Sequence, residues 1–171
     1  WLAPALNIHR SIRCGRNFEY YSEDPFVAGT ICAAEVQGIQ SKGVYVYLKH
    51  VALNDSETSR RGVNTWLNEQ TAREIYLEVA DKAITDGGAW SVMTGFNRWG
   101  ATWCGANANL LTGFLRGELG MRGMCITDFS GSSQYMDLVD GLIAGSDIWD
   151  SPMPKIHTTK ACLLYTSPSP R

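Results

Sequence analysis

The sequence lacks the features that mark several large classes of protein. Its apolar runs are short, whereas a membrane-crossing helix needs about 20 apolar residues. No Cys-x-x-Cys pair occurs, and no cysteine and histidine are spaced as zinc ligands, so we expect no metal. No Gly-x-Gly-x-x-Gly follows an apolar run, and we expect no cofactor. The net charge of −2 offers no basic face, so the sequence predicts neither a nucleic-acid nor a membrane partner.

What is present is the composition of an ordinary globular domain. The chain has 171 residues, of which 44% are hydrophobic and 19% charged, which excludes a disordered protein. Its five cysteines have apolar neighbours and are expected to be buried, reduced thiols. Cysteine usage of this kind favours the cytoplasm, although disulfides remain the alternative.

The two ends of the chain differ from the rest. Trp1 takes the place of an initiating Met and lies in an apolar run, so we expect the natural start to be missing. The absence of a signal peptide therefore excludes nothing. The final string CLLYTSPSPR has no periodicity and resembles the translation of a sequencing adapter. We predict a non-native, unstructured tail over residues 161–171, a Pro-rich linker being the alternative.

Short apolar runs of strand length alternate with segments of helical period between these ends. An acidic start before Pro25 and the pair Gly87-Gly88 are typical of a helix beginning and a helix end. The predicted strands are 2–8, 44–49, 90–96, 124–128 and 146–149, and the predicted helices are 26–40, 68–83, 109–118 and 135–143.

This alternation predicts parallel strands joined by helical crossovers, hence an α/β fold. The loops that follow the strands are long and polar, whereas those that precede them are short and rich in glycine. Such asymmetry is typical of a (β/α)8 barrel, in which the loops after the strands build the active site. We therefore predict a partial (β/α)8 TIM-type barrel over residues 1–160, with a doubly wound sheet open on the pattern alone.

Polar residues occur repeatedly where the predicted strands end. Lys49 and His50 close one strand, and Asp128 closes another. Burying an ionised side chain there is costly unless a partner or a ligand compensates. Taken singly, Lys49 could form a salt bridge, and Arg16 and Arg60 could be solvated loop charges. Their joint placement at one end of the strands favours a site.

Seven segments, taken in order, closely resemble the catalytic barrel of family 3 glycoside hydrolases, the β-glucosidase group. The resemblance extends from about Pro4 to Trp149. It implies a retaining, exo-acting β-glycosidase in which the active site lies between a (β/α)8 barrel and an α/β sandwich domain. The segments are APALNIHR, CGRNFEYYSEDP, KHVALNDSETSR, REIYLEVADKAI, VMTGFN, LLTGFLRGELGMRGMCITDF and AGSDIW.

The resemblance also implies a role for individual residues. Asp128, in Thr127-Asp128-Phe129, matches the family's nucleophile, which attacks the anomeric carbon and forms a covalent intermediate. Lys49 and His50 match a pair that holds sugar hydroxyls. Arg16 and Arg60 match two arginines of the same subsite. These cations would keep the nucleophile ionised at neutral pH.

Two departures from the family pattern limit what this segment can do alone. Phe96 stands in the substrate subsite where many members have a tyrosine that donates a hydrogen bond to the nucleophile. The general acid of β-glucosidase-like members lies on the sandwich domain, which this segment lacks. We therefore expect the segment alone to be inactive and its parent chain to act on a β-linked glucoside or oligosaccharide. The branch that uses a His-Asp dyad is disfavoured, because its K-H-F-P-G type sequence is absent.

Two other functions remain open. A Schiff-base aldolase could use Lys49 at a strand end, provided that the lysine lies in an apolar pocket. A sugar-binding barrel that has lost catalysis is the second alternative, and Phe96 is the feature in its favour. Trp103 and Trp149 are the tryptophans that we expect to stack on sugar rings.

Overall fold

The computed structural model describes residues 1–130 and 135–150 of the chain. The predicted tail over residues 161–171 lies outside the described residues. The elements in chain order are η1 (Asn17–Glu19), α1 (Pro25–Gln40), β1 (Tyr47–Val51), β2 (Asn64–Thr65), α2 (Glu69–Thr71), η2 (Ala72–Leu77), α3 (Glu78–Thr85), β3 (Ser91–Thr94), β4 (Arg98–Trp99), β5 (Thr102–Trp103), η3 (Cys104–Ala106), η4 (Asn109–Glu118), β6 (Cys125–Thr127) and α4 (Leu138–Ala144).

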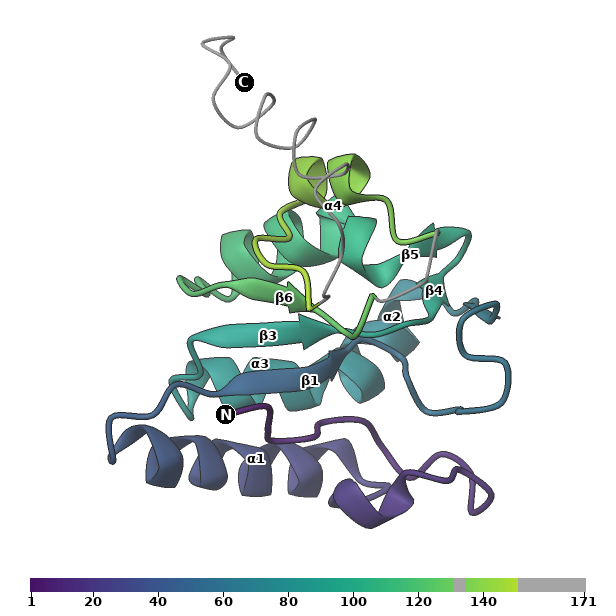
Figure 1. Cartoon of the computed structure of the whole chain (residues 1–171). Coiled ribbons are helices and arrows are strands. Elements are labelled where there is room, and N and C mark those ends of the chain that lie inside the picture. The colour runs from purple at the N-terminus through teal and green to yellow at the C-terminus, as the bar shows by residue number, and fades with distance from the viewer. Residues whose placement is uncertain (131–134, 151–171) are drawn as a thin grey trace, which may run out of the picture.

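The centre of the fold is a parallel sheet in the order β1-β3-β6, whose strands point the same way in Figure 1. Two further chain segments run parallel to its edges as single bridges, Ala5 beside Lys49 and Ile148 beside Ile126. Five segments therefore lie side by side in the order of the sequence. The prediction of parallel α/β crossovers is confirmed, but the first and last predicted strands are each reduced to one bridge.

The four predicted helices are all present, and their caps explain where they begin and end. Asp24 accepts a hydrogen bond from the backbone N–H of Val27, so α1 begins at Pro25. The helical segments α2, η2 and α3 run on as one stretch over residues 69–85, two residues beyond the predicted end. The last helix, α4, begins three residues later than predicted, because Asp137 caps it. It ends on Gly145, whose φ of 113° suits a residue without a side chain.

A second, smaller sheet was not predicted. It has the order β2-β4-β5, with β2 parallel to β4 and β4 antiparallel to β5. Its strands have two residues each and lie inside the loops that follow β1 and β3. These loops, which the sequence shows to be long and polar, are therefore tied to each other beside the carboxyl ends of the large sheet.

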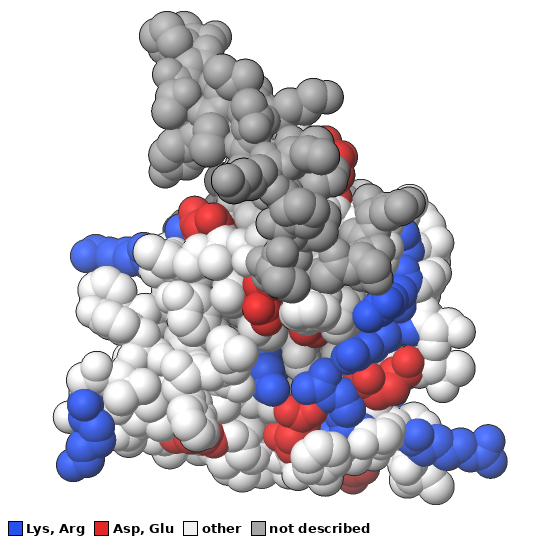
Figure 2. Space-filling model, viewed as in Figure 1, with Lys and Arg blue, Asp and Glu red and all other residues white. Residues whose placement is uncertain are grey.

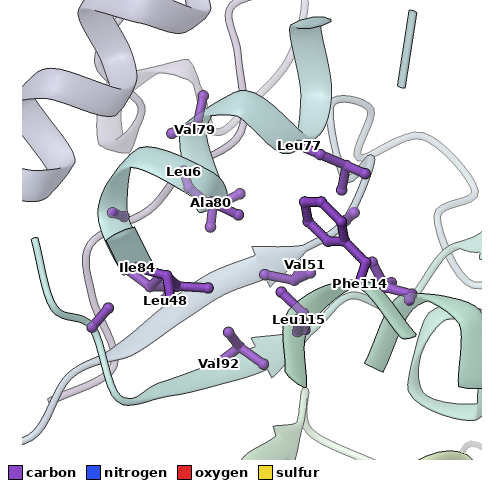
Figure 3. Packing of buried hydrophobic residues seen from close by; sticks show 14 of the residues in the cluster. Leu6, Leu48, Val51, Leu77, Val79, Ala80, Ile84, Val92, Phe114 and Leu115 are labelled. Atoms are coloured by element: carbon purple, nitrogen blue, oxygen red, sulfur yellow. The ribbon is translucent and has the colours of Figure 1, made fainter. Parts of the chain in front are cut away.

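The core lies between the large sheet and the helices. Leu48, Val92 and Cys125 are neighbours on adjacent strands and are all inaccessible to solvent. Figure 3 shows Leu48 and Val92 among side chains of the helical stretch 69–85 and of η4, such as Ile84 and Leu115. The packing fixes the strands, and hence the position of every residue at their ends.

The cysteines of the described residues form no disulfide bond. Cys14, Cys32, Cys104 and Cys125 are free thiols, and the last three are buried. Among the described residues, no helix has the length and apolar character to span a membrane. Over the same residues, no group of three or more His, Cys, Asp and Glu side chains is arranged to hold a metal ion.

Candidate active site

The predicted site residues gather at the carboxyl ends of the parallel strands. Asp128 follows β6 directly, Lys49 and His50 belong to β1, and Phe96 lies two residues after β3. The loops after the first bridge segment and after β1 carry two arginines, Arg16 and Arg60. Figure 2 shows basic and acidic side chains gathered together on the face where these loops lie.

Asp128 is held in place by the backbone around it. Its N–H donates to the carbonyl of Thr94 at the end of β3 (3.1 Å). Its Oδ1 accepts a hydrogen bond from the N–H of Phe129 (2.7 Å), which fixes the orientation of the carboxyl group. The side chain is 14% exposed. Within residues 1–130 and 135–150, no group donates a hydrogen bond to its buried Oδ2 atom.

Burial and charge act in opposite directions on this carboxyl group. Burial raises the pKa of Asp128, and this effect outweighs the N–H of Phe129 and the cations Arg60, Arg16 and Lys49, which lower it. The three predicted cations are therefore in place, but they oppose the rise in pKa rather than reverse it.

His50 touches the same carboxyl group without forming an ion pair. Its Nε2 atom lies 3.2 Å from Oδ2 of Asp128, and its side chain is 2% exposed. Burial, with the charges of Arg16 and Lys49, lowers the pKa of His50 well below its ordinary value, so the ring is neutral. Nη1 of Arg16 lies 3.4 Å from the same Nε2 atom and can only donate, so this nitrogen accepts from the arginine and gives no hydrogen bond to Oδ2.

Two glutamates that the prediction missed neutralise the cations. Glu19 forms ion pairs with Arg16 and with Lys49, whose Nζ lies 3.3 Å from Oε2. Glu57 lies 3.0 Å from Nη1 of Arg60 and 4.0 Å from Nη1 of Arg16. Burial would raise the pKa of Glu19, but its two basic partners hold that pKa below the usual value. Arg16 and Glu19 are three residues apart in the sequence, as are Glu57 and Arg60, so these two pairs are local. The contacts of Glu19 with Lys49 and of Glu57 with Arg16 depend on how separate segments of the chain meet.

The aromatic residues have a different environment from the one expected. Phe96 is 2% exposed, and the guanidinium of Arg60 lies 4.3 Å from the centre of its ring. The ring therefore supports a cation rather than offering an open face. Trp103 is 4% exposed and donates a hydrogen bond to the carbonyl of Gly95, so the expectation that it stacks on sugar is wrong. Trp149 is partly exposed.

Buried amides hold the strand ends that carry the site. The side chain of Asn7 donates to the carbonyl of His50 (3.1 Å) and accepts from its N–H (3.0 Å). Asn97 donates to the carbonyl of Ala52 (2.9 Å). The two amides therefore position the backbone at the carboxyl end of β1.

A cavity of about 670 Å³ lies away from these residues. It opens between the helical stretch 69–85 and η4, with Trp99 and Phe114 in its wall. The guanidinium of Arg73 forms two hydrogen bonds across it with the carboxylate of Glu118. None of the predicted site residues lines this cavity, so it is separate from the candidate active site.

Comparisons with known proteins all point to the same family. The profile described as the glycosyl hydrolase family 3 N terminal domain matches residues 1–148. The chain is 42% identical over 148 residues to β-glucosidase A of Butyrivibrio fibrisolvens, covering 86% of this chain and 18% of that protein. It is 40% identical over 156 residues to the thermostable β-glucosidase B of Acetivibrio thermocellus, covering 91% and 20%. The chain thus spans about a fifth of the length of these relatives.

Solved structures match as well. β-Glucosidase 3B of Thermotoga neapolitana, solved in complex with glucose, superposes with a TM-score of 0.82 at 42% identity, covering 86% of this chain and 20% of that one. The GH3 β-glucosidase of Bifidobacterium adolescentis superposes with a TM-score of 0.88 at 34% identity, covering 97% and 24%.

One buried carboxyl group beside the site predicts how stability depends on pH. Asp55 is 4% exposed and accepts a hydrogen bond from the N–H of Ile8 (3.1 Å). Burial raises the pKa of Asp55 to about 6. The folded protein then binds more protons than the unfolded one between about pH 4 and 6, so the free energy of unfolding falls as pH rises through that range. Because the raised pKa of Asp128 contributes a fall of the same sign, Asp55→Asn should reduce this fall rather than abolish it. It should stabilise the full-length parent protein at pH 7.5 by about 2 kcal/mol.

Urea unfolding of the full-length parent protein at a series of pH values measures this difference. Asp86→Asn is the matched control, because that carboxylate is 57% exposed and pairs with Lys82 on the helix surface. We expect the control to follow the wild type. Parallel curves for the wild type and Asp55→Asn would show that this carboxyl group is not the source of the dependence.

Proposed function

This chain belongs to glycosyl hydrolase family 3, and from that premise we propose that it is the nucleophile-bearing part of a retaining β-glycosidase. The observation that carries the proposal is the environment of Asp128. A carboxylate with one oxygen held by the backbone, and the other without a donor among the described residues, can form a bond to an anomeric carbon from a fixed position. Relatives named as β-glucosidases make a terminal β-linked glucose the expected substrate.

The sheet supports a finer assignment of the fold. Five parallel segments follow each other in sequence order across the sheet, as in a (β/α)8 barrel. In a doubly wound sheet the strands are also parallel, but after the first strands the chain returns to the middle of the sheet and adds the later strands on the other side. We propose that residues 1–160 form part of such a barrel. The gathering of polar residues at the carboxyl ends of its strands agrees with the position of active sites in that fold.

The neighbouring residues fit the handling of a sugar. Lys49 and Arg16 can donate to hydroxyl groups from positions fixed by Glu19. His50 is neutral and can donate or accept. The guanidinium of Arg60 packs against the ring of Phe96 and adds a third cation to the subsite. We propose these four residues as the sugar-binding group around Asp128.

The general acid is expected from the rest of the parent chain. The glutamates beside the subsite are engaged by cations, and the lowered pKa of Glu19 leaves it without a proton to donate at neutral pH. Asp55 is buried and directed at the N–H of Ile8, which removes it from contact with substrate. A retaining enzyme requires a second carboxyl group about 5–5.5 Å from the first. We propose that the missing α/β sandwich domain supplies it.

The aldolase alternative fits the site less well. A Schiff-base lysine is activated by an apolar pocket, whereas Lys49 lies 3.3 Å from a carboxylate and beside two other cations. The lapsed sugar-binding alternative keeps one feature in its favour, since the ring of Phe96 has no hydroxyl that could donate to Oδ2 of Asp128.

Replacing the nucleophile tests the proposal. Asp128→Asn in the full-length parent protein should lower kcat on p-nitrophenyl β-glucoside by about three orders of magnitude or more, because no covalent intermediate can form. Asp140→Asn is the control, since it removes an exposed carboxylate from α4. An Asp128→Asn variant that retains most of the turnover would refute the role, and an inert wild type that still binds sugar would favour the lapsed barrel.

Restoring the tyrosine tests the account of the charge on Asp128. In Phe96→Tyr, a hydroxyl that reaches Oδ2 donates to the charged form and lowers the pKa of Asp128. The acid limb of the kcat/KM profile, which reports the free enzyme, should then move to lower pH. Phe96→Leu removes the ring without adding a donor and should not move the limb downward. Identical limbs for wild type and Phe96→Tyr would show that the hydroxyl does not reach the nucleophile.

A further inference from the structure

The charges around Asp128 fall into two groups, of which only the inner group is balanced. The three cations of the sugar-binding group face three carboxylates, those of Glu19, Glu57 and Asp128. Arg61 and Arg98 lie beside this group, and in the described part of the chain neither forms a salt bridge. Residues 131–134 and 151–171 contain no Asp or Glu in the sequence, so this chain offers no further carboxylate side chain there.

We propose that Arg61 and Arg98 form an anion-binding subsite for the leaving group, and that the protein prefers β-glucosides whose aglycone carries a carboxylate. This inference rests on the proposed function, because it places the anion next to a sugar held at Asp128. It concerns residues of the two loops that the small sheet joins.

The two arginines are held by packing and by the backbone. The guanidinium of Arg98 lies 4.6 Å from the centre of the Tyr135 ring, and that of Arg61 lies 5.4 Å from the centre of the Phe96 ring. Nη1 of Arg98 also donates to the carbonyl of Arg61 (2.9 Å), which ties the two residues together. A guanidinium seated on an aromatic face keeps N–H groups at its edge, where they can bind a carboxylate with two hydrogen bonds.

Tyr135 and Phe96 show where this pair lies relative to the sugar-binding group. Its hydroxyl donates to the carbonyl of Phe96 (3.0 Å). Burial raises the pKa of Tyr135, and the charges of Arg98 and Arg61 oppose that rise. The guanidinium of Arg60 lies 4.3 Å from the centre of the Phe96 ring, and that of Arg61 lies 5.4 Å from the same centre. Arg61 shares the Phe96 ring with Arg60, and Arg98 is tied to Arg61, so the pair borders the sugar-binding group on the side of Arg60.

The position and the charge together identify the ligand chemistry. Before the bond to Asp128 forms, the glucose of the intact substrate occupies the inner, neutral group, and the aglycone is still attached to it. In the proposed complex, that aglycone lies at the outer arginines. Two guanidinium groups that no carboxylate of the described residues neutralises attract an anion and disfavour a cation. A carboxylate on an aryl aglycone would reach them while the glucose remains in the inner subsite. The basic side chains on this face are visible in Figure 2.

Binding of two non-hydrolysable ligands to the full-length parent protein tests the inference. The ligands are 4-carboxyphenyl 1-thio-β-D-glucoside and its neutral 4-carbamoylphenyl counterpart, and calorimetry gives a Kd for each. We expect the wild type to bind the charged ligand about 5-fold more tightly at low salt. The preference should weaken as NaCl rises from about 0.05 to about 0.5 M, because exposed ion pairs are screened.

Matched variants locate the effect. The double variant Arg61→Gln/Arg98→Gln should bring the ratio of the two Kd values close to one, and Arg61→Lys/Arg98→Lys should keep part of the preference because the charges remain. Arg122→Gln, an exposed arginine ahead of β6 at the opposite end of the strand, should leave the ratio as in the wild type.

The outcomes separate this inference from the proposed function. If the neutral ligand binds and the charged one gains nothing, the anion subsite is refuted while the sugar site stands. The anion subsite is also refuted if the wild-type preference survives in Arg61→Gln/Arg98→Gln. If neither ligand binds, the sugar site itself is refuted and the subsite falls with it.

Discussion

The burial of one carboxylate at the end of β6 is the constraint on which the rest of the site depends. A buried charge is costly unless opposite charges and hydrogen bonds compensate. Asp128 receives one backbone hydrogen bond and lies near three cations, yet burial still raises its pKa. The cations need partners of their own, which Glu19 and Glu57 supply. The result is a set of five charges around the carboxylate of Asp128, whose Oδ2 atom receives no hydrogen bond from the described residues.

The parallel sheet makes this arrangement possible. Adjacent strands place Lys49 beside Met93 and Thr94 beside Thr127, so their carboxyl ends meet at one edge. The helices pack against Leu48 and Val92 and hold the strands in register. The loops then bring in Arg16 and Arg60, and the small sheet joins the later loops to each other. Precision in the site is therefore a consequence of packing in the core some distance away.

Much of this could be predicted, for physical reasons that differ between residues. The helix over 25–40 carries its own cap, and an apolar run that ends in a carboxylate marks Asp128 without any partner being known. Glu19 and Glu57 were missed because a loop glutamate looks like any solvated charge until its cation is located. The small sheet was missed because strands of two residues carry no periodicity. Trp103 was misjudged because burial by a loop leaves no sequence signal.

The proposed function depends above all on a covalent bond between Asp128 and the sugar. The most direct measurement is to incubate the full-length parent protein with an activated 2-deoxy-2-fluoro-β-glucoside, digest it, and locate the label by mass spectrometry. We expect a fluoroglucosyl group on the peptide that contains Asp128. A label on Glu19 or Glu57 instead, or turnover of β-glucosides by a protein that is never labelled, would contradict it.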